Sequence, residues 1–231
     1  MHMCTTMGLA GFSSHDASFG YWDSPLVEAV AIVFMMLAGI SFAMYFMAWR
    51  QRSLRAIVRN PEAQAFYVVI VGSIALISVF LWVHGSYPDY LQALRHTAFH
   101  VVSIATTTGY ATQDYVQWPI FAPLLMLLLG CFATCAGSTG GGIKMVRMLL
   151  LLQRSQRELV RIVHPNVVNP IVLGGRTVDA RVMQNVVAFM MMYGATLVSL
   201  AMVLLFKGMD VVTAFTAVIA CVNNIGPGLG E

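Results

Sequence analysis

The sequence predicts an all-α integral membrane fold, built from repeated units in which two membrane spans flank a re-entrant loop. Hydrophobic residues make up 58% of the 231 residues and charged residues only 10%, a composition outside the range of soluble domains. About 18 helical residues rise roughly 27 Å, enough to cross a bilayer core. Four apolar stretches reach that length: Leu26–Trp49, Phe66–Val83, Pro119–Ala136 and Val182–Phe206.

The basic residues indicate which side of the membrane each connection occupies. All but two of the 13 lie in two connections, at residues 50–59 and 144–181, and Lys and Arg near span ends favour the cytoplasm. Residues 1–25, 84–118 and 207–231 are then outside. Six acidic residues lie in these outer segments and should attract cations: Asp16, Asp23, Asp89, Asp114, Asp210 and Glu231.

Two outer segments contain short helices that are too short and too polar to span the membrane. Tyr90–Ala105 runs directly into Thr106-Thr107-Thr108-Gly109, and Asp210–Cys221 is followed closely by Asn223-Asn224-Ile225-Gly226. Leu9-Ala10-Gly11 fits the same template, and the three glycines recur at intervals of 98 and 117 residues. We call these three segments the glycine turns. Their recurrence predicts a repeat of about 100 residues.

The glycine turns have the composition of a cation filter. A K⁺ ion that enters the membrane needs oxygen ligands in place of water, and backbone carbonyls with Thr or Asn oxygens can supply them. Glycine permits the positive φ that aims successive carbonyls at one axis, and each preceding helix directs its partly negative end there. One such segment alone is more typical of an ordinary loop, whereas three on the same side favour a filter. The predicted K⁺ filter residues are Leu9, Ala10, Gly11, Thr106, Thr107, Thr108, Gly109, Asn223, Asn224, Ile225 and Gly226.

A glycine-rich segment, here called the glycine loop, stands at the inner end of the third span. Its residues are Gly137, Ser138, Thr139, Gly140, Gly141, Gly142, Ile143 and Lys144. It is not a phosphate-binding loop, because Ile143 separates the last glycine from the lysine. Each glycine weakens a helix by about 1 kcal/mol, so the span should break here. Two interpretations stay open, a flexible gate at the cytoplasmic end of a pore and a helix end capped by glycine.

Other kinds of site find little support. The four cysteines lack a metal-binding spacing, and His96 and His100 share a helix face without a third ligand. No span contains a nucleophile with its base or a carboxylate pair, so an enzyme is not expected. We expect no cofactor and no nucleic-acid partner. The alternatives to ion uptake are a secondary transporter of another solute, which predicts inverted repeats, and a non-conducting structural membrane subunit.

Four motifs, taken in order, resemble the TrkH potassium uptake proteins, within the TrkH/TrkG/KtrB superfamily. They are ATTTGY at Ala105–Tyr110, CAGSTGGGIKMVR at Cys135–Arg147, HPNVVNPIVLGGRTV at His164–Val178 and NNIGPGLG at Asn223–Gly230. The resemblance implies potassium uptake across the bacterial inner membrane by four span–pore–span repeats, related to K⁺ channel subunits, around one pore. It also implies an intramembrane gating loop at Gly137–Lys144. The implied partners are membrane lipid, a second copy in a homodimer, and a cytoplasmic nucleotide-binding regulator like TrkA.

On this resemblance the chain divides into three units. Residues 1–60 correspond to the end of the second repeat, 61–165 to the third, with its broken span at 119–148, and 166–231 to an incomplete fourth. Gly11, Gly109 and Gly226 then correspond to the filter glycines of these repeats. Because a first repeat and a last span are missing from this pattern, we expect a partial chain that does not conduct alone.

Overall fold

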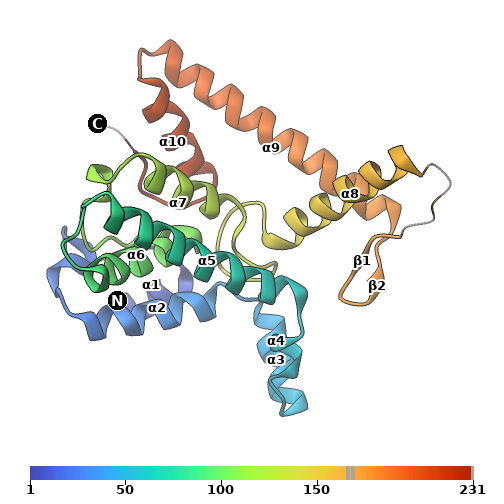
Figure 1. The fold of residues 1–231 in the computed structure, drawn as a ribbon, viewed down its shortest axis with the longest axis horizontal. Coiled ribbons are helices and arrows are strands. Elements are labelled where there is room, and N and C mark those ends of the chain that lie inside the picture. Colours follow the sequence, from blue (N-terminus) through green and yellow to red (C-terminus); the bar gives the residue numbers. More distant parts are fainter. Residues whose placement is uncertain (165–166, 168–169, 230–231) are drawn as a thin grey trace.

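The computed structural model describes residues 1–164, 167 and 170–229, and these are mostly helical (Figure 1). In chain order the elements are α1 (His2–Gly8), the 3₁₀ turn Ser18–Tyr21, α2 (Pro25–Ala38), α3 (Phe42–Gln51), α4 (Arg55–Val58), α5 (Pro61–Val83), α6 (Tyr90–Ala105), the 3₁₀ turn Tyr115–Gln117, α7 (Phe121–Phe132), α8 (Met145–Val163), β1 (Val172–Leu173), β2 (Arg176–Thr177), α9 (Ala180–Phe206) and α10 (Val211–Val222).

Two helices in the described part of the chain are long and apolar enough to cross a membrane. These are α5 and α9, which contain the predicted spans Phe66–Val83 and Val182–Phe206. Helix α5 begins sharply, because Pro61 occupies its first turn and the Asn60 side chain accepts hydrogen bonds from the amides of Glu62 and Ala63.

The predicted span Leu26–Trp49 is not one continuous helix, although its two helices together are long and apolar enough for one bent span. The segment forms α2 and α3, which are bent by 87° at Gly39–Ser41. The backbone groups freed by this bend find partners in the loop after α7: the amide of Cys135 donates to the carbonyl of Gly39 at 3.0 Å, and the amide of Phe42 donates to the carbonyl of Gly137 at 3.0 Å. A broken helix at membrane depth is tolerated where neighbouring protein satisfies its backbone in this way.

The predicted span Pro119–Ala136 is shorter than expected. Its helix, α7, has 12 residues, and the chain is non-helical from Ala133 to Lys144 before α8 begins. The predicted break is therefore present, but it starts four residues before the first glycine of the glycine loop. The amide of Ile143 donates to the carbonyl of Cys131 at 2.7 Å, so the loop folds back against the end of α7.

The short helices match their sequence prediction closely. Helix α6 has the predicted bounds, and α10 begins one residue late because Asp210 caps it by accepting from the amide of Val212. Helix α6 lies at the centre of the molecule and contacts α2, α5 and α7. Its buried face includes Phe99 and Ile104, which join Phe66 and Met126 in the core.

The region expected on the cytoplasmic side is more ordered than a loop. It contains α8, of 19 residues, and a hairpin in which Val172 pairs with Thr177. Apart from this short hairpin the all-α prediction is confirmed for the described residues. Residues 165–166 and 168–169 of the third motif, together with Gly230 and Glu231, lie outside the described residues.

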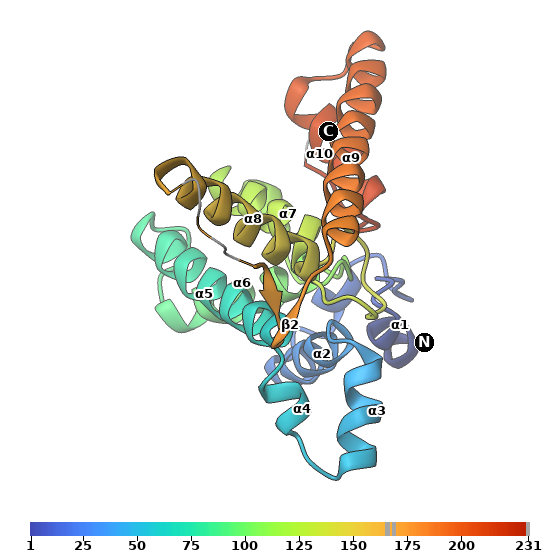
Figure 2. The same ribbon diagram turned by 90° about the vertical axis from the view of Figure 1, so that its right-hand side faces the viewer.

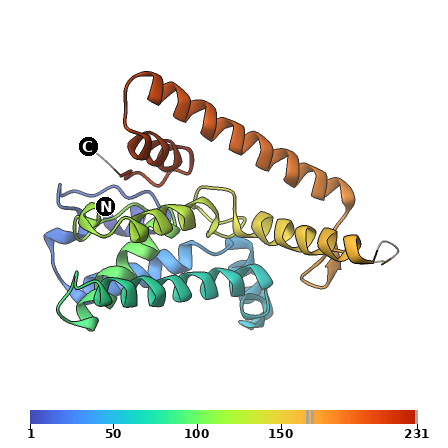
Figure 3. The same cartoon turned by 45° about the horizontal axis from the view of Figure 1, so that its top comes forward.

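The arrangement in space brings distant segments together. Helices α9 and α10 form an arm that stands away from the α2–α5–α6 bundle (Figure 2). Helix α10 turns back beneath α9 and lies against α7 (Figure 3). The ends of α1, α6 and α10 carry the three glycine turns.

Candidate functional site

The short helices α1, α6 and α10 all end in the same backbone turn. At each end a non-glycine residue takes a left-handed conformation and its amide bonds the carbonyl three residues back, while the next amide bonds the carbonyl five residues back. This pair of bonds is a Schellman motif, normally closed by glycine. The left-handed residues are Leu9, Thr107 and Asn224, with φ of 49°, 61° and 57°. A positive-φ glycine follows two positions later in each turn: Gly11, Gly109 and Gly226.

The three turns contact one another in sequence order. A Cβ atom on Gly11 would lie 2.1 Å from the carbonyl oxygen of Thr108, and one on Gly109 would lie 2.2 Å from that of Ile225. Thr108 immediately precedes Gly109, and Ile225 immediately precedes Gly226, so the carbonyl occupies the same position in both turns. No side chain fits at these contacts, so the backbones meet directly. Gly226 has no described atom within 4 Å of its Cβ position.

Side-chain oxygens of the turns are used to hold neighbouring segments. The Thr107 hydroxyl accepts from the amide of Gly141 at 2.8 Å, and the Asn223 side-chain oxygen accepts from the Tyr193 hydroxyl of α9 at 2.9 Å. The Thr106 hydroxyl donates to the carbonyl of Val102 at 2.6 Å. The oxygens without such engagements are mainly backbone carbonyls.

The glycine loop touches the end of every one of these short helices. The Thr139 hydroxyl donates to the carbonyl of Met7 in α1 at 3.1 Å. A Cβ atom on Gly140 would lie 3.0 Å from the carbonyl of Thr106, and one on Gly141 would lie 2.0 Å from the carbonyl of Asn223. No side chain fits at either glycine, because Gly141 meets this carbonyl and Gly140 also meets the Thr134 side chain, 2.4 Å from its Cβ position.

Lys144 turns its side chain back into the glycine loop. Its ammonium group donates to the carbonyl of Gly140 and lies 3.5 Å from the hydroxyl oxygens of Thr134 and Ser138. Lys144 itself has φ of 76°, unusual for a residue with a side chain. Gly137 and Gly142 have positive φ as well, at 78° and 82°. The structure thus brings all the predicted loop residues into one turn that carries a positive charge.

Sequence reasoning missed the brace provided by Tyr110. This residue follows Gly109, is 1% exposed, and places its hydroxyl 2.5 Å from the Thr5 hydroxyl of α1. The Ser103 hydroxyl holds its backbone by donating to the Tyr110 carbonyl at 2.7 Å. An aromatic residue after the glycine in Gly11-Phe12 and Gly109-Tyr110 was the available signal, yet Phe12 is exposed while Tyr110 is buried.

His96 and His100 hold the segment that follows α6. His100 hydrogen-bonds the carbonyls of His96 and Gln113 at 2.9 and 3.1 Å, and His96 lies 3.2 Å from the side-chain amide nitrogen of Gln113. Both rings are therefore engaged with the protein around Gln113. No cluster of three or more metal-ligating side chains occurs in the described residues.

An ion pair reduces the predicted negative charge of the outer face. Arg95 of α6 donates to Glu28 at 2.6 and 2.8 Å and to Asp23 at 2.8 Å. Glu28 is 2% exposed, so the pair ties the centre of the molecule to α2. Asp23, expected to attract cations, is therefore partly neutralised.

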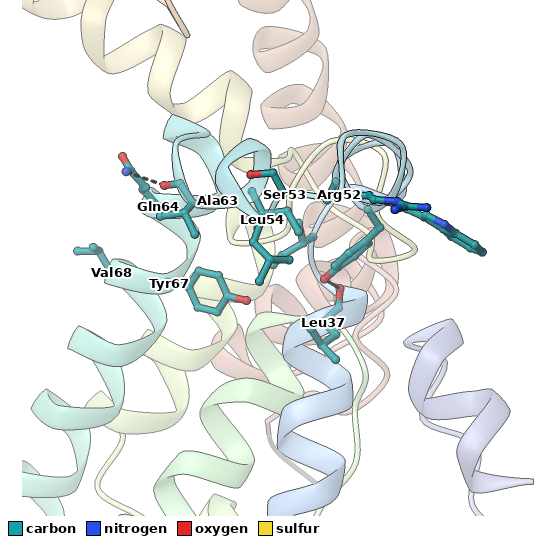
Figure 4. A pocket seen from close by; sticks show the side chains of 14 residues that line it. Leu37, Arg52, Ser53, Leu54, Ala63, Gln64, Tyr67 and Val68 are labelled. Atoms are coloured by element: carbon teal, nitrogen blue, oxygen red, sulfur yellow. Dashed lines mark hydrogen bonds between the residues drawn. The ribbon is translucent and has the colours of Figure 1, made fainter.

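A cavity of about 900 Å³ lies away from the glycine turns. It is an apolar groove between the end of α2, helices α3 and α4, and the start of α5, and Leu54 and Tyr67 extend into it (Figure 4). None of the residues predicted for the filter or the gate lines it.

Two long apolar helices, a bent helix pair and three short helices that end in matching turns are the architecture of an integral membrane protein. A family model described as "TrkH: Cation transport protein" matches residues 1–231. The chain belongs to the TrkH family, an integral membrane transporter family of the bacterial inner membrane and not an enzyme family.

Several known proteins are similar over the whole chain. The Trk system potassium uptake protein TrkH of Salmonella typhimurium is 39% identical over 229 residues, which cover 99% of this chain and 47% of that protein. TrkG of Escherichia coli is 36% identical, with the same coverage. The crystal structure of the potassium transporter TrkH from Vibrio parahaemolyticus superposes with a TM-score of 0.94 at 38% identity, covering 100% of this chain and 50% of that one. The chain spans about half the length of the curated relatives it matches.

Proposed function

We propose that this chain forms part of a potassium uptake pathway across the bacterial inner membrane. The curated relatives are named as Trk system potassium uptake proteins. One observation carries the proposal: three helices end in the same turn, and Gly11 and Gly109 each pack against a carbonyl of the next turn. The shared sense and order of the turns favour an ion pathway over a secondary transporter with inverted repeats.

The filter in this proposal is made mainly of backbone oxygen. Residues Leu9–Gly11, Thr106–Gly109 and Asn223–Gly226 present carbonyls at the partly negative ends of α1, α6 and α10, where a dehydrated K⁺ is favoured. The Thr107 and Asn223 side chains act as braces, because both are already hydrogen-bonded to other segments. Selectivity then depends on how rigidly the turns are held.

The gate in this proposal is the glycine loop, Gly137–Lys144. It lies against the ends of the same short helices, and the Lys144 ammonium group sits within it. A fixed positive charge in the ion path opposes a cation. The loop must therefore move before K⁺ can pass.

The proposed pore needs more than this chain. We assign residues 1–60, 61–165 and 166–231 to three successive span–pore–span repeats, of which the first and last are incomplete. The open side of Gly226 is where a further turn would fit, and the relatives are about twice as long. The working unit is then a homodimer of the full-length protein, surrounded by lipid and regulated by a TrkA-like nucleotide-binding protein on its cytoplasmic side.

Potassium-dependent growth of an uptake-deficient strain tests the filter. The full-length gene should rescue growth at low K⁺, and Gly109→Ser should impair rescue or admit Na⁺, because a side chain at Gly109 meets the Ile225 carbonyl. Gly85→Ser is the matched control, since Gly85 also has positive φ, of 70°, but no described atom lies within 4 Å of its Cβ position. Equal rescue and unchanged selectivity in Gly109→Ser would remove the filter assignment.

A further inference from the structure

Glu62 is a buried carboxylate whose place in the fold the proposed pore does not explain. It lies in the first turn of α5 and is 8% exposed. One of its oxygens accepts two hydrogen bonds, from the amide of Ala136 at 2.6 Å and from the amide of Val146 at 3.1 Å. Ala136 immediately precedes the glycine loop and Val146 follows it closely. A single side-chain atom therefore joins the two ends of that loop.

Helix α8 needs this contact because it has no cap of its own. Lys144 occupies its N-cap position and makes no side-chain cap hydrogen bond. An uncapped N-terminus leaves amides unpaired and carries a partial positive charge, which a carboxylate stabilises. Glu62 supplies from another helix the acceptor that Lys144 cannot provide.

The two sides of this contact differ in how firmly they are held. Glu62 sits on α5, a 23-residue span whose start is fixed by Pro61 and by the Asn60 cap. Its partners lie on the glycine loop and on α8, which extends to the predicted cytoplasmic side and packs on α9 through Arg147 over the Phe189 ring, 4.0 Å away. A movement of α8 would act directly on the amide of Val146.

We propose that Glu62 is a latch that holds the glycine loop closed beneath the filter, and that displacement of α8 releases it. This inference rests on the proposed function and adds a positioning residue and a route of regulation to it. Among the described residues Glu62 forms no ion pair, so its charge depends on the two amides that only the closed arrangement provides. A buried carboxylate that loses its hydrogen-bond donors is strongly destabilised. Intermediate positions of the loop are therefore unfavourable compared with the closed one.

The test uses the full-length protein, purified without a regulator and reconstituted in liposomes. Glu62→Ala should raise basal K⁺ flux at least about ten-fold, because it removes two charge-assisted hydrogen bonds from a predominantly closed state and the loss of one alone corresponds to about that factor. The K⁺ over Na⁺ ratio should stay unchanged, because the glycine turns are untouched. Glu62→Gln keeps the shape and one acceptor oxygen and should give a smaller increase. Glu158→Gln, an exposed carboxylate on α8, is the control and should leave flux unchanged.

Amide hydrogen exchange separates a latch from a general structural role. In Glu62→Ala the amides between Ala136 and Val146 should exchange faster, while those of α6 should not. Faster exchange throughout α6, or a folded variant with unchanged flux, would overturn the proposal. If Glu62→Ala does not fold, Glu62→Gln decides by the same two measurements. Gly109→Ser, measured in parallel, separates failure of the latch proposal from failure of the proposed filter. If Gly109→Ser alters selectivity but the Glu62 variants do not raise flux, the latch proposal is rejected and the filter proposal stands.

Discussion

At the scale of single residues, the candidate filter is held by side chains that bridge it to neighbouring segments. Tyr110 reaches α1, Thr107 reaches the glycine loop, and Asn223 is reached by Tyr193 of α9. Carbonyl oxygens pointing at one axis repel one another, so a rigid surround is needed to keep them there. These contacts provide that surround. Removing one of them should therefore lower the free energy of unfolding even where it leaves K⁺ flux unchanged.

Tyr110→Phe should lower the free energy of unfolding by about 1 kcal/mol, the usual contribution of one buried hydrogen bond. The ring keeps its contacts, and the Thr5 hydroxyl keeps other acceptors, including the His2 and Phe12 carbonyls, so no buried group is orphaned. Thermal unfolding of the purified full-length protein measures the change. Tyr21→Phe, at a residue 60% exposed, is the control. A loss no larger than that of the control would show that the Tyr110 hydroxyl does not brace α1.

At the scale of elements, the molecule depends on pairs of broken helices that satisfy each other. The bend between α2 and α3 and the break after α7 exchange backbone hydrogen bonds, so neither could persist in lipid without the other. The Arg95 ion pair likewise joins α6 to α2 at the predicted outer side. These links make α2 a support for the candidate pore as well as a span.

Arg95→Met should destabilise the protein by about 3 kcal/mol, because it leaves the Glu28 carboxylate buried without its partner. Arg161→Met removes the exposed pair with Glu158, whose atoms are 3.8 Å apart, and should change stability by less than about 0.5 kcal/mol. The midpoints of thermal unfolding compare the two variants.

The double variant Arg95→Met with Glu28→Met identifies the cause. If the buried charge is responsible, removing it should recover most of the lost stability. No recovery would mean instead that the packing of the Arg95 stem holds α6 to α2.

At the scale of the whole molecule, the predicted sides of the membrane correspond to opposite ends of the structure. The segments expected outside gather at the left in Figure 1, and α3, α4, α8 and the hairpin lie toward the right. The two basic connections therefore lie toward the same end of the molecule in that view.

A membrane-impermeant maleimide tests this orientation in spheroplasts. With the native cysteines replaced, Asp89→Cys in the exposed turn before α6 should be labelled at once. Ser155→Cys on the exposed face of α8 should be labelled only after the membrane is permeabilised, because the arginines of α8 favour the cytoplasm. The reverse pattern would contradict the assigned topology.

Hydropathy and helix-ending residues were enough to predict the long helices and both later short helices. Composition cannot show a bend, however. The apolar stretch Leu26–Trp49 therefore predicted one span, although the helix is interrupted between Gly39 and Ser41. A Cβ atom on Gly39 would meet the Phe66 ring at 2.8 Å, a contact between residues 27 positions apart that no local pattern contains. The early start of the break after α7 has the same origin, since Cys135 is bonded to Gly39.

The sequence alone predicted that this chain lies in a membrane, which way it faces, and where its backbone turns on glycine, because hydropathy, charge placement and glycine content are properties of local segments. Only the tertiary structure decided that the three glycine turns meet, that the glycine loop lies beneath them, and that Glu62 joins the ends of that loop. These contacts are made by backbone amides and carbonyls that have no hydrogen-bond partner within their own helix. Which distant group becomes the partner depends on how the whole chain packs.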